Sequence, residues 1–375
     1  MKILIAPDKF KGSLSSQEVA DSIEEGIFTS IPCCQIDKLY VADGGDGTME
    51  AVVMSLGGLW VDTVVHNPLN KEISVRYGII NGDTAVLDVA IASGIALIGK
   101  KQCNPLQTTS FGTGEIIIDA INRGVRKFLI GLGGSATNDA AMGILSALGY
   151  KFLDDNGIVL PPIGCSLNSV VDIDESEVDV RLKECSFTLL CDVSADFCGV
   201  NGAAYLFAPQ KGASYDDVLV LDAGLENFAK ILQEKFGKDI KYERFAGAAG
   251  GIGGTLFAVL NAELANGIEE ILDIVGFNKK VVGADFVITG EGAMDKTSLL
   301  GKTPFGVCRR ALAKGVKTIA LAGRIDDAQI LLDNGFYSVH SVVPNGMKLE
   351  EAMLPGIAKD NIKRTASEVF RLLSK

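Results

Sequence analysis

Apolar runs alternate with amphipathic stretches near both ends of the chain. In the N-terminal part, Ser15 and Glu18 have the spacing of a capping box and predict the start of a helix that ends near residue 28. The other elements expected there are strands at residues 2–6 and 36–41 and a helix ending near 56. The C-terminal part repeats this order, with strands at 285–289, 317–322 and 337–343 and helices at 304–314, 326–334 and from 358. Strands that alternate with helices predict a mostly parallel sheet with helices on both faces.

The middle of the chain is less regular. Its expected strands lie at residues 73–80, 84–89, 128–130 and 187–190. We therefore expect an α/β protein of two domains. Residues 1–65 and 280–375 form a discontinuous Rossmann-like, doubly wound parallel-sheet domain, and residues 66–279 form a second α/β domain inserted into it. The active site is expected in the cleft between the domains, at the carboxyl ends of strands.

Short loops of glycine and carboxylate follow several of the apolar runs, each with a helix pattern after it. They lie at residues 42–48, 131–139, 191–194, 247–254 and 289–295. Glycine lets backbone N–H groups approach an anion, and the N-terminus of a helix adds partial positive charge. Carboxylates beside such loops suit a hard cation such as Mg²⁺. Phosphate binding together with metal-binding carboxylates is typical of phosphoryl transfer, so the pattern predicts a kinase.

Composition limits the kinds of partner. The chain has 375 residues, more than one hydrophobic core usually covers, and its 47% hydrophobic content and 43 glycines fit a compact α/β protein. Its net charge of −12 argues against a nucleic acid or an anionic membrane as a partner. The expected partners are a small-molecule substrate and a nucleotide, and a homodimer is left open.

The sequence also favours the cytoplasm and disfavours some hydrolase mechanisms. The apolar stretch within residues 1–8 is too short for a signal peptide, and the apolar region 85–99 is too short for a membrane span. The eight cysteines contain no C-x-x-C pair and are expected to be reduced thiols. With only two histidines and no H-E-x-x-H motif, a histidine-based triad or zinc hydrolase is disfavoured.

A second enzyme class remains open because of one glycine loop. Gly131, Gly133 and Ala136 have the spacing of a dinucleotide fingerprint, and Asp154 lies about twenty residues further on. This motif would fit an NAD-dependent dehydrogenase of a small hydroxy acid. The polar cluster at 135–139 argues for direct side-chain contact with a small ligand instead. Residues 301–303 resemble the end of a P-loop, but Lys296 stands where its first glycine should be, so a Walker A loop is rejected.

Taken together, these segments resemble the bacterial glycerate kinase family, the type without a MOFRL domain. The resemblance runs nearly end to end. The segments that carry it are 6–12, 42–48, 109–115, 131–139, 209–213, 247–254 and 289–292 with Asp295. The resemblance implies that ATP and Mg²⁺ are used to phosphorylate D-glycerate, with 2-phosphoglycerate the favoured product.

The chain departs from the family pattern at a few positions. Residues 194–196 are Ser-Ala-Asp where the family usually has Thr-Asn-Pro, and Ala293 and Thr297 replace the usual Arg and Gln. Asp88 stands where a glutamate is usual. The lost Asn and Arg would be hydrogen-bond donors to a ligand, so a non-catalytic sensor of a hydroxy acid is a third hypothesis.

The kinase hypothesis assigns a role to each candidate residue. Asp43 or Asp192 accepts the proton of the substrate hydroxyl, and Asp46, Glu291 and Asp295 are candidate Mg²⁺ ligands. The substrate carboxylate and the phosphates are held by a larger group of lysines, polar residues and glycine amides. The members of this group are Asp8, Lys9, Lys11, Gly44, Gly133, Gly134, Ser135, Asn138, Asp139, Lys211, Gly250, Gly251 and Lys302.

This assignment predicts the effect of neutralising the two candidate bases. Asp43→Asn and Asp192→Asn proteins should fold normally and lose most of their turnover, because an amide cannot accept the hydroxyl proton. The measurement is kcat for each purified variant, with circular dichroism as the control for folding. Wild-type kcat in both variants would contradict the assignment.

Overall fold

The computed structural model describes residues 1–373, and in it the chain divides into two compact units. The first unit comprises residues 1–43, 50–56 and 266–375, and the second comprises 44–49 and 57–265. Each unit contains its own sheet. Within residues 1–373, no helix is both long and apolar enough to cross a membrane.

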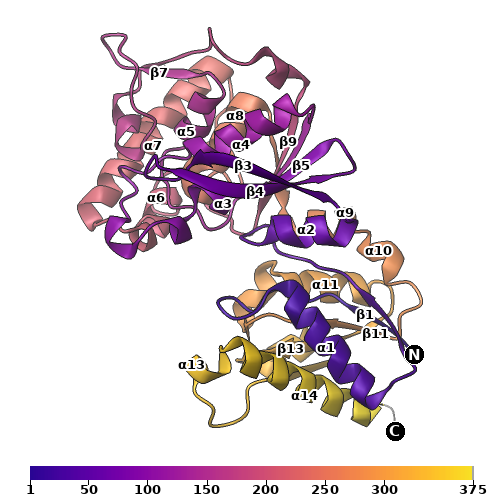
Figure 1. Cartoon of the computed structure of the whole chain (residues 1–375). Helices are drawn as coiled ribbons and strands as arrows, with labels where there is room; N and C mark the ends of the chain where they lie inside the picture. The colour runs from indigo at the N-terminus through magenta and orange to yellow at the C-terminus, as the bar shows by residue number, and fades with distance from the viewer. Residues whose placement is uncertain (374–375) are drawn as a thin grey trace. The chain divides into compact units, whose positions relative to one another are not determined.

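The sheet of the first unit has five parallel strands. Its order is β2-β1-β11-β13-β15, from β1 (Lys2–Ile5), β2 (Gln35–Lys38), β11 (Phe286–Thr289), β13 (Lys317–Ala322) and β15 (Ser338–Ser341). Figure 1 labels β1, β11 and β13 of this sheet. The chain leaves β1 toward one edge and later returns to its other side, so the strand order reverses between β1 and β11. In open α/β sheets, ligands bind beyond the carboxyl ends of strands at such a reversal.

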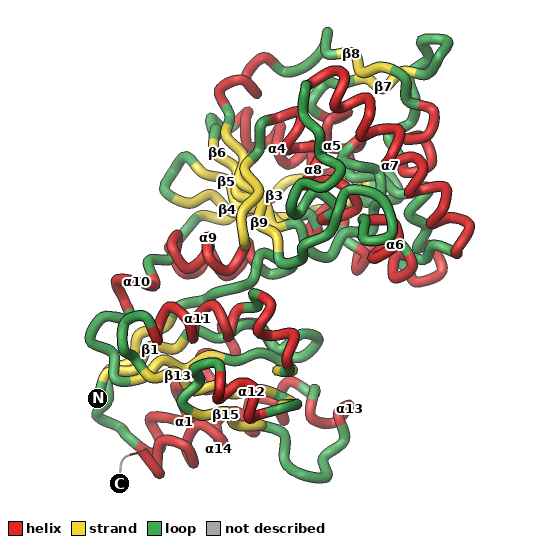
Figure 2. The backbone as a smooth tube through the Cα atoms, turned by 180° about the vertical axis from the view of Figure 1, so that it is seen from behind, coloured by secondary structure: helices red, strands yellow, loops and turns green. Residues whose placement is uncertain are grey.

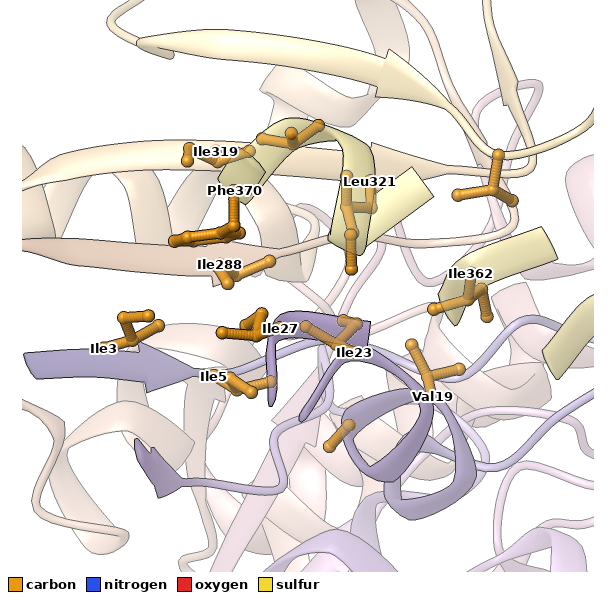
Figure 3. Packing of buried hydrophobic residues seen from close by; sticks show 14 of the residues in the cluster. Ile3, Ile5, Val19, Ile23, Ile27, Ile288, Ile319, Leu321, Ile362 and Phe370 are labelled. Carbon is orange, nitrogen blue, oxygen red and sulfur yellow. The ribbon is translucent and has the colours of Figure 1, made fainter. Parts of the chain in front are cut away.

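Helices cover both faces of this sheet, as predicted. On β13, Ile319 and Leu321 belong to a core shared with α1 (Ser16–Ser30) and α14 (Pro355–Leu373) (Figure 3). Ala320 and Ala322 alternate with them and face α11 (Thr303–Leu312) and α12 (Ala328–Asp333). This alternation follows from the two-residue period of a strand. Figure 2 shows α11 and the α1–α14 pair on opposite sides of the strands.

The remaining elements of the first unit are short. They are part of α2 (Thr48–Leu56), α9 (Gly267–Ile274), α10 (Phe277–Lys280), β12 (Ala293–Met294), a 3₁₀ helix η6 (Lys296–Leu300), β14 (Arg324–Ile325) and α13 (Leu349–Ala352). The predicted capping box of α1 is confirmed. Ser15 Oγ accepts from the amide of Glu18 at 3.2 Å, and the Glu18 carboxylate accepts from the amide of Ser15 at 3.0 Å.

The second unit contains a mixed six-stranded sheet. Its order is β3-β4-β5-β6-β9-β10, from β3 (Leu59–His66), β4 (Glu72–Ile80), β5 (Thr84–Asp88), β6 (Lys127–Gly131), β9 (Ser186–Cys191) and β10 (Glu263–Asn266). β5, β6 and β9 run parallel, whereas β3–β4 and β4–β5 are antiparallel pairs. The main helices are α4 (Phe111–Asn122), α5 (Met142–Ala147), α6 (Ala203–Phe207), α7 (Tyr215–Phe236) and α8 (Ala248–Leu260). The second unit also contains a short helix, α3 (Ala90–Ser93), and a small antiparallel pair, β7 (Lys151–Leu153) and β8 (Asp172–Asp174).

In the two larger sheets, the sequence analysis did not predict β10 or the longer strand β3. β3 pairs with β4 over its whole length, yet it ends the sheet and exposes Leu59 and Val64. An edge strand with apolar residues on its open face lacks the alternation that identifies a half-buried strand. The expected domain boundary at residues 65 and 66 falls inside β3, whereas the two units meet in sequence at residues 56 and 57.

The close crossing of α1 and α14 predicts a stability effect. A Cβ on Gly26 would stand 2.4 Å from the carbonyl oxygen of Lys363 and 2.9 Å from Cβ of Ala366. Gly26→Ala should therefore lower the free energy of unfolding by about 1–3 kcal/mol, although alanine is the better helix former. The measurement is the denaturant midpoint, followed by circular dichroism.

A matched control lies on the partner helix. Gly356 lies in α14, and a Cβ there would meet nothing within 4 Å. Gly356→Ala should leave the free energy of unfolding unchanged or raise it by up to about 1 kcal/mol. Equal losses in both variants would show that helix crowding at Gly26 is not the cause.

Candidate active site

In the first unit, the loops that follow β1 and β11 are hydrogen-bonded to each other. The amide of Asp8 donates to the carbonyl of Gly290 (2.9 Å), and the hydroxyl of Thr289 donates to the carbonyl of Ala6 (2.8 Å). A Cβ on Gly290 would stand 1.8 Å from the carbonyl oxygen of Leu321, so a side chain has no room at that point. These contacts hold two acid-bearing loops side by side where the strand order reverses.

Asp8 is a buried carboxyl group with acidic neighbours. It is 8% exposed and accepts hydrogen bonds from Thr303 Oγ1 at 2.6 Å and from the amide of Lys9 at 2.7 Å. Burial raises the pKa of Asp8 to about 7, and the charges of Asp43 and Glu291 act in the same direction. Near neutral pH, Asp8 can therefore both hold and release a proton.

Glu291 is the third acid of this group. Its carboxylate accepts from Ser298 Oγ at 2.5 Å and lies 3.6 Å from Nζ of Lys302. Burial raises the pKa of Glu291, as does Asp43, while the contacts with Ser298 and Lys302 oppose the shift. We call Asp8, Asp43 and Glu291 the acidic cluster.

The chemistry of the acidic cluster fits a divalent cation. Burial and mutual repulsion disfavour the ionised carboxylates, and a bound cation would relieve both effects. Within residues 1–373 no three His, Cys, Asp or Glu side chains form a ready-made metal cage. Mg²⁺ does not require one, because it usually keeps several waters and is held by one or two carboxylates and the substrate phosphates.

The other predicted metal ligands have different surroundings. Asp295 caps η6, where its carboxylate accepts from the amide of Thr297 at 2.7 Å and from Thr297 Oγ1 at 2.5 Å. These hydrogen bonds lower the pKa of Asp295. Asp46 belongs to the second unit, whereas Glu291 and Asp295 belong to the first.

The predicted lysines of the first unit surround the same loops. Lys9 follows Asp8 directly and is partly buried, and Lys11 is exposed. Lys302 precedes α11 and contacts Glu291. Thr303, the first residue of α11, was missed by the sequence analysis although it bonds Asp8. Its only signal was its place at the start of a helix, next to Lys302.

In the second unit, two of the predicted glycine loops pack on each other. A Cβ on Gly133 would stand 2.6 Å from the backbone nitrogen of Asp46, and one on Gly131 would stand 2.5 Å from Oδ1 of Asp88. The Asp88 carboxylate accepts from the amides of Gly47 (2.8 Å) and Met49 (3.0 Å). Asp88 thus anchors residues 44–49 and was missed as a site residue. Its signal was the single charge in the apolar run 85–99.

This packing removes the dinucleotide fingerprint. A Rossmann fingerprint needs its glycine turn to lead directly into a helix that receives the pyrophosphate. After Gly131, the next helix, α5, begins only at Met142, and residues 44–46 pack against the turn. Asp154 instead accepts from the amides of Asn156 and Ile158 in a local turn. The structure therefore gives no support to the dehydrogenase hypothesis.

Lys211 is a buried lysine whose hydrogen bonds go to neutral oxygens. It is 3% exposed, and its Nζ donates to Ser135 Oγ at 2.9 Å and to the carbonyl of Thr137 at 2.7 Å. Burial lowers the pKa of Lys211 to about 7, against the opposing influence of Asp139. A buried ammonium group without a bonded carboxylate is suited to pair with an incoming anion.

Unsatisfied polar atoms lie on and next to the residues that Lys211 contacts. Both side-chain amide atoms of Asn138 and the hydroxyl of Thr137 are buried and lack a hydrogen-bond partner. Asp139 accepts from the amide and hydroxyl of Ser110 (2.7 and 2.8 Å) and from the amide of Gly143 (3.2 Å), and burial raises its pKa. Buried polar groups normally have partners, so the orphaned amide of Asn138 indicates a polar ligand or water.

The glycine segment at the start of α8 contacts this polar group. Ala249, Gly250 and Gly251 are consecutive residues with φ of 53°, 73° and 92°. A Cβ on Gly250 would stand 2.2 Å from the carbonyl oxygen of Thr137. The amide of Gly254 donates to the carbonyl of Ala246 at 2.9 Å, so it is engaged within the protein. We call Ser135, Thr137, Asn138, Lys211 and Gly250 the lysine site.

The two candidate bases lie on different units. Asp43 belongs to the first unit and to the acidic cluster, whereas Asp192 follows β9 in the second unit and is exposed. The structure therefore brings most predicted residues into two groups, one in each unit. Gly44 and Gly134 belong to the paired glycine loops of the second unit.

The fold and the two groups of residues define a class: a two-domain α/β protein with a cation-attracting acidic cluster and an anion-attracting lysine site. Phosphotransferases require both kinds of site.

The comparisons with known proteins identify the family. Residues 3–374 match the model of the Glycerate kinase family. The chain is 40% identical over 371 residues to a glycerate kinase of Bacillus subtilis (strain 168), covering 98% of this chain and 97% of that protein. It is 40% identical over 376 residues to a glycerate 2-kinase of Escherichia coli (strain K12), covering 100% and 98%. The chain belongs to the glycerate kinase family.

A solved structure agrees with this relationship. A crystal structure from Salmonella typhimurium LT2, described provisionally as a glycerate kinase 2, matches the model with a TM-score of 0.88 at 38% identity. The match covers 100% of this chain and 98% of that chain. The two-domain α/β fold is therefore shared over the full length.

Lys211 predicts a pH-dependent stability. The folded state binds the Lys211 proton more weakly than an ordinary lysine of pKa 10.5, so protonation disfavours folding. The wild type should lose stability relative to Lys211→Met as the pH falls from about 10.5 to about 7, with no further change below that window. The measurement is urea unfolding of both proteins at several pH values.

An exposed lysine of the same unit supplies the control. Lys101→Met removes a positive charge at the surface, so its stability should follow that of the wild type across the same pH range. A constant difference between wild type and Lys211→Met over that range would contradict the expected protonation behaviour of Lys211.

Proposed function

We propose that this protein transfers the γ-phosphoryl group of ATP to D-glycerate, with the 2-hydroxyl as the favoured acceptor. The observation that carries the proposal is its likeness to glycerate kinases along nearly the whole chain. One relative at 40% identity is named a glycerate 2-kinase, which favours 2-phosphoglycerate as the product.

The lysine site suits the carboxylate of glycerate. Lys211 offers a buried ammonium group, and Asn138 offers an amide without a partner in the protein. Glycerate carries a carboxylate next to a hydroxyl, so a fixed charge partner and a fixed amide would restrict its rotation as well as its position. Ser135 and Asp139 line the same part of the second unit and orient these groups.

The acidic cluster suits the metal-assisted part of the reaction. Glu291 and Asp8 would hold Mg²⁺ together with phosphate oxygens, with Asp46 and Asp295 as further candidates. When bound, Mg²⁺ neutralises charge on the phosphoryl group. Asp43 would be the base that accepts the hydroxyl proton, and Asp192 is the alternative base.

Positive charges and backbone amides complete the proposed site. Lys9, Lys11 and Lys302 would contact phosphates in the first unit, where Lys302 stands at the start of α11. In the second unit, Gly133 and Gly250 keep backbone close to backbone. The amides of Gly44, Gly133, Gly134, Gly250 and Gly251 would contact the substrate or phosphates.

We also place this activity in the cytoplasm. Cys191, Cys198 and the other six cysteines are all free, which fits a reducing compartment. Burial raises the pKa of Cys198 and of Cys308 to about 11, so these thiols stay protonated.

A coupled ADP-release assay tests the proposed function. ATP, Mg²⁺ and D-glycerate should give steady ADP release, and tartronate and lactate should give less because they change the groups around the reacting hydroxyl. Removing Mg²⁺ with EDTA should abolish release, and excess Mg²⁺ should restore it. Phosphorus NMR of the product distinguishes 2-phosphoglycerate from 3-phosphoglycerate.

The same assay separates the sensor hypothesis from the kinase. A sensor would be stabilised against heat by glycerate alone and would release no ADP under any of these conditions. That combination would overturn the proposed function, because it requires binding of the acid without transfer.

A further inference from the structure

A cavity of about 260 Å³ lies in the first unit beside the start of α11. Its lining comes from η6, the turn at Gly301, α11 and the start of α9. The residues that matter here are Asn266, Glu269, Leu299, Gly301, Phe305 and Arg309. We call this space the Phe305 cavity.

The lining of the Phe305 cavity combines an apolar wall with a few polar groups. Leu299 and Phe305 are partly buried against the small core under α11. Asn266 supplies an amide, and the guanidinium of Arg309 is paired with Glu269. Pockets for small organic ligands commonly combine an apolar wall with a few polar groups that fix the orientation of the ligand.

Gly301 keeps the amide of Asn266 accessible at the cavity. Gly301 has φ of 111°, and a Cβ built on it would stand 3.5 Å from Nδ2 of Asn266. A side chain at this position would be strained and would occupy the space next to that amide. Oδ1 of Asn266 accepts from the amide of Glu269 at 3.4 Å, so Nδ2 supplies the donor that an acceptor nitrogen on the edge of an adenine ring requires.

The cavity adjoins the acidic cluster through adjacent residues. Gly301 and Phe305 flank Lys302 and Thr303, whose side chains contact Glu291 at 3.6 Å and Asp8 at 2.6 Å. Thr303 begins the ten-residue helix α11, and its N-terminal end favours negative charge. If the flat ring of a ligand occupied the cavity, a phosphate chain attached to it would therefore lie near Lys302 and the acidic cluster, which suit phosphates and a cation.

We propose that the Phe305 cavity binds the adenine ring of the nucleotide, which makes the first unit the nucleotide-binding unit. This inference rests on the proposed function in taking a nucleotide as the phosphoryl donor. Glycerate does not fit the cavity equally well, because it has no ring to cover the Leu299 and Phe305 wall.

Three variants in the full chain test the proposal. Phe305→Leu keeps an apolar side chain and removes the ring, and Phe305→Ala removes both. Asn266→Asp keeps a residue that caps helices well, as Asn266 does for α9, but removes the amide donor. Tyr337→Ala is the matched control, because Tyr337 is an exposed aromatic residue of the same unit outside the cavity lining.

The measurements are binding of fluorescently labelled ADP without glycerate, and KM for ATP and for D-glycerate. Phe305→Ala and Asn266→Asp should each weaken ADP binding and raise KM for ATP by roughly 10-fold, with kcat and KM for glycerate little changed. Phe305→Leu should lie between Phe305→Ala and the wild type. Asn266→Asp should also reduce the preference for ATP over GTP. Tyr337→Ala should bind ADP as the wild type does.

The outcomes separate this inference from the proposed function. If ADP affinity is unchanged in Phe305→Ala and Asn266→Asp while glycerate is phosphorylated, the cavity assignment is wrong and the kinase stands. If KM for glycerate rises instead of KM for ATP, the cavity holds the acid, and the assignment is again wrong. If the wild type binds ADP but phosphorylates no acid, the proposed function fails, and the ADP binding of the variants still decides the cavity.

Discussion

Buried groups of like charge repel each other, and the first unit is organised around that constraint. Asp8 and Glu291 both have raised pKa values because burial and neighbouring acids disfavour their ionised forms. The loops that carry them stay together because β1 and β11 pair in the sheet and their carboxyl ends are hydrogen-bonded. The backbone thus imposes an arrangement that the side chains alone would not adopt, and a proton or a cation relieves it.

The second unit shows the same principle with the opposite sign. Lys211 is enclosed with two neutral oxygen partners, and the neighbouring Asn138 amide has none in the protein. Its surroundings depend on glycine, since a side chain on Gly250 would collide with the backbone of Thr137. Each unit therefore buries charged groups of one sign, an arrangement that suits the proposed reaction between an anionic acid and a metal-bound nucleotide.

Much of the fold could be predicted because the strands of the first unit lie in or beside short apolar runs that alternate with helix patterns. The capping box at Ser15 follows from the spacing of Ser15 and Glu18. The gathering of Asp8 and Glu291 was also accessible, because parallel strands bring their carboxyl ends to one edge. Edge strand β3 could not be predicted, because the exposed apolar residues Leu59 and Val64 disrupt the alternation of apolar and polar positions.

The roles of individual side chains were harder to predict, because each side chain contacts residues that are distant in sequence. Gly133 was predicted to bind phosphate through its amide, and the sequence did not indicate that it also packs against the backbone of Asp46. Asp295 was expected to bind metal, but it also caps η6, a role that any carboxylate before a helix can take. Thr303 and Asp88 gain their importance only from contacts made across the folded chain.

The pairing of β1 with β11 also determines when the sheet of the first unit can assemble during synthesis. Lys2 and Asp285, joined by a hydrogen bond, are 283 residues apart. At a synthesis rate of about 5–20 residues per second, β1 leaves the ribosome tens of seconds before its central neighbour exists. The second unit ends at residue 265, shortly before β11 begins at Phe286, so nearly all of it is synthesised while β1 has no β11 to pair with. Assembly of the five-stranded sheet of the first unit requires closure of a long loop and is therefore a late event of synthesis.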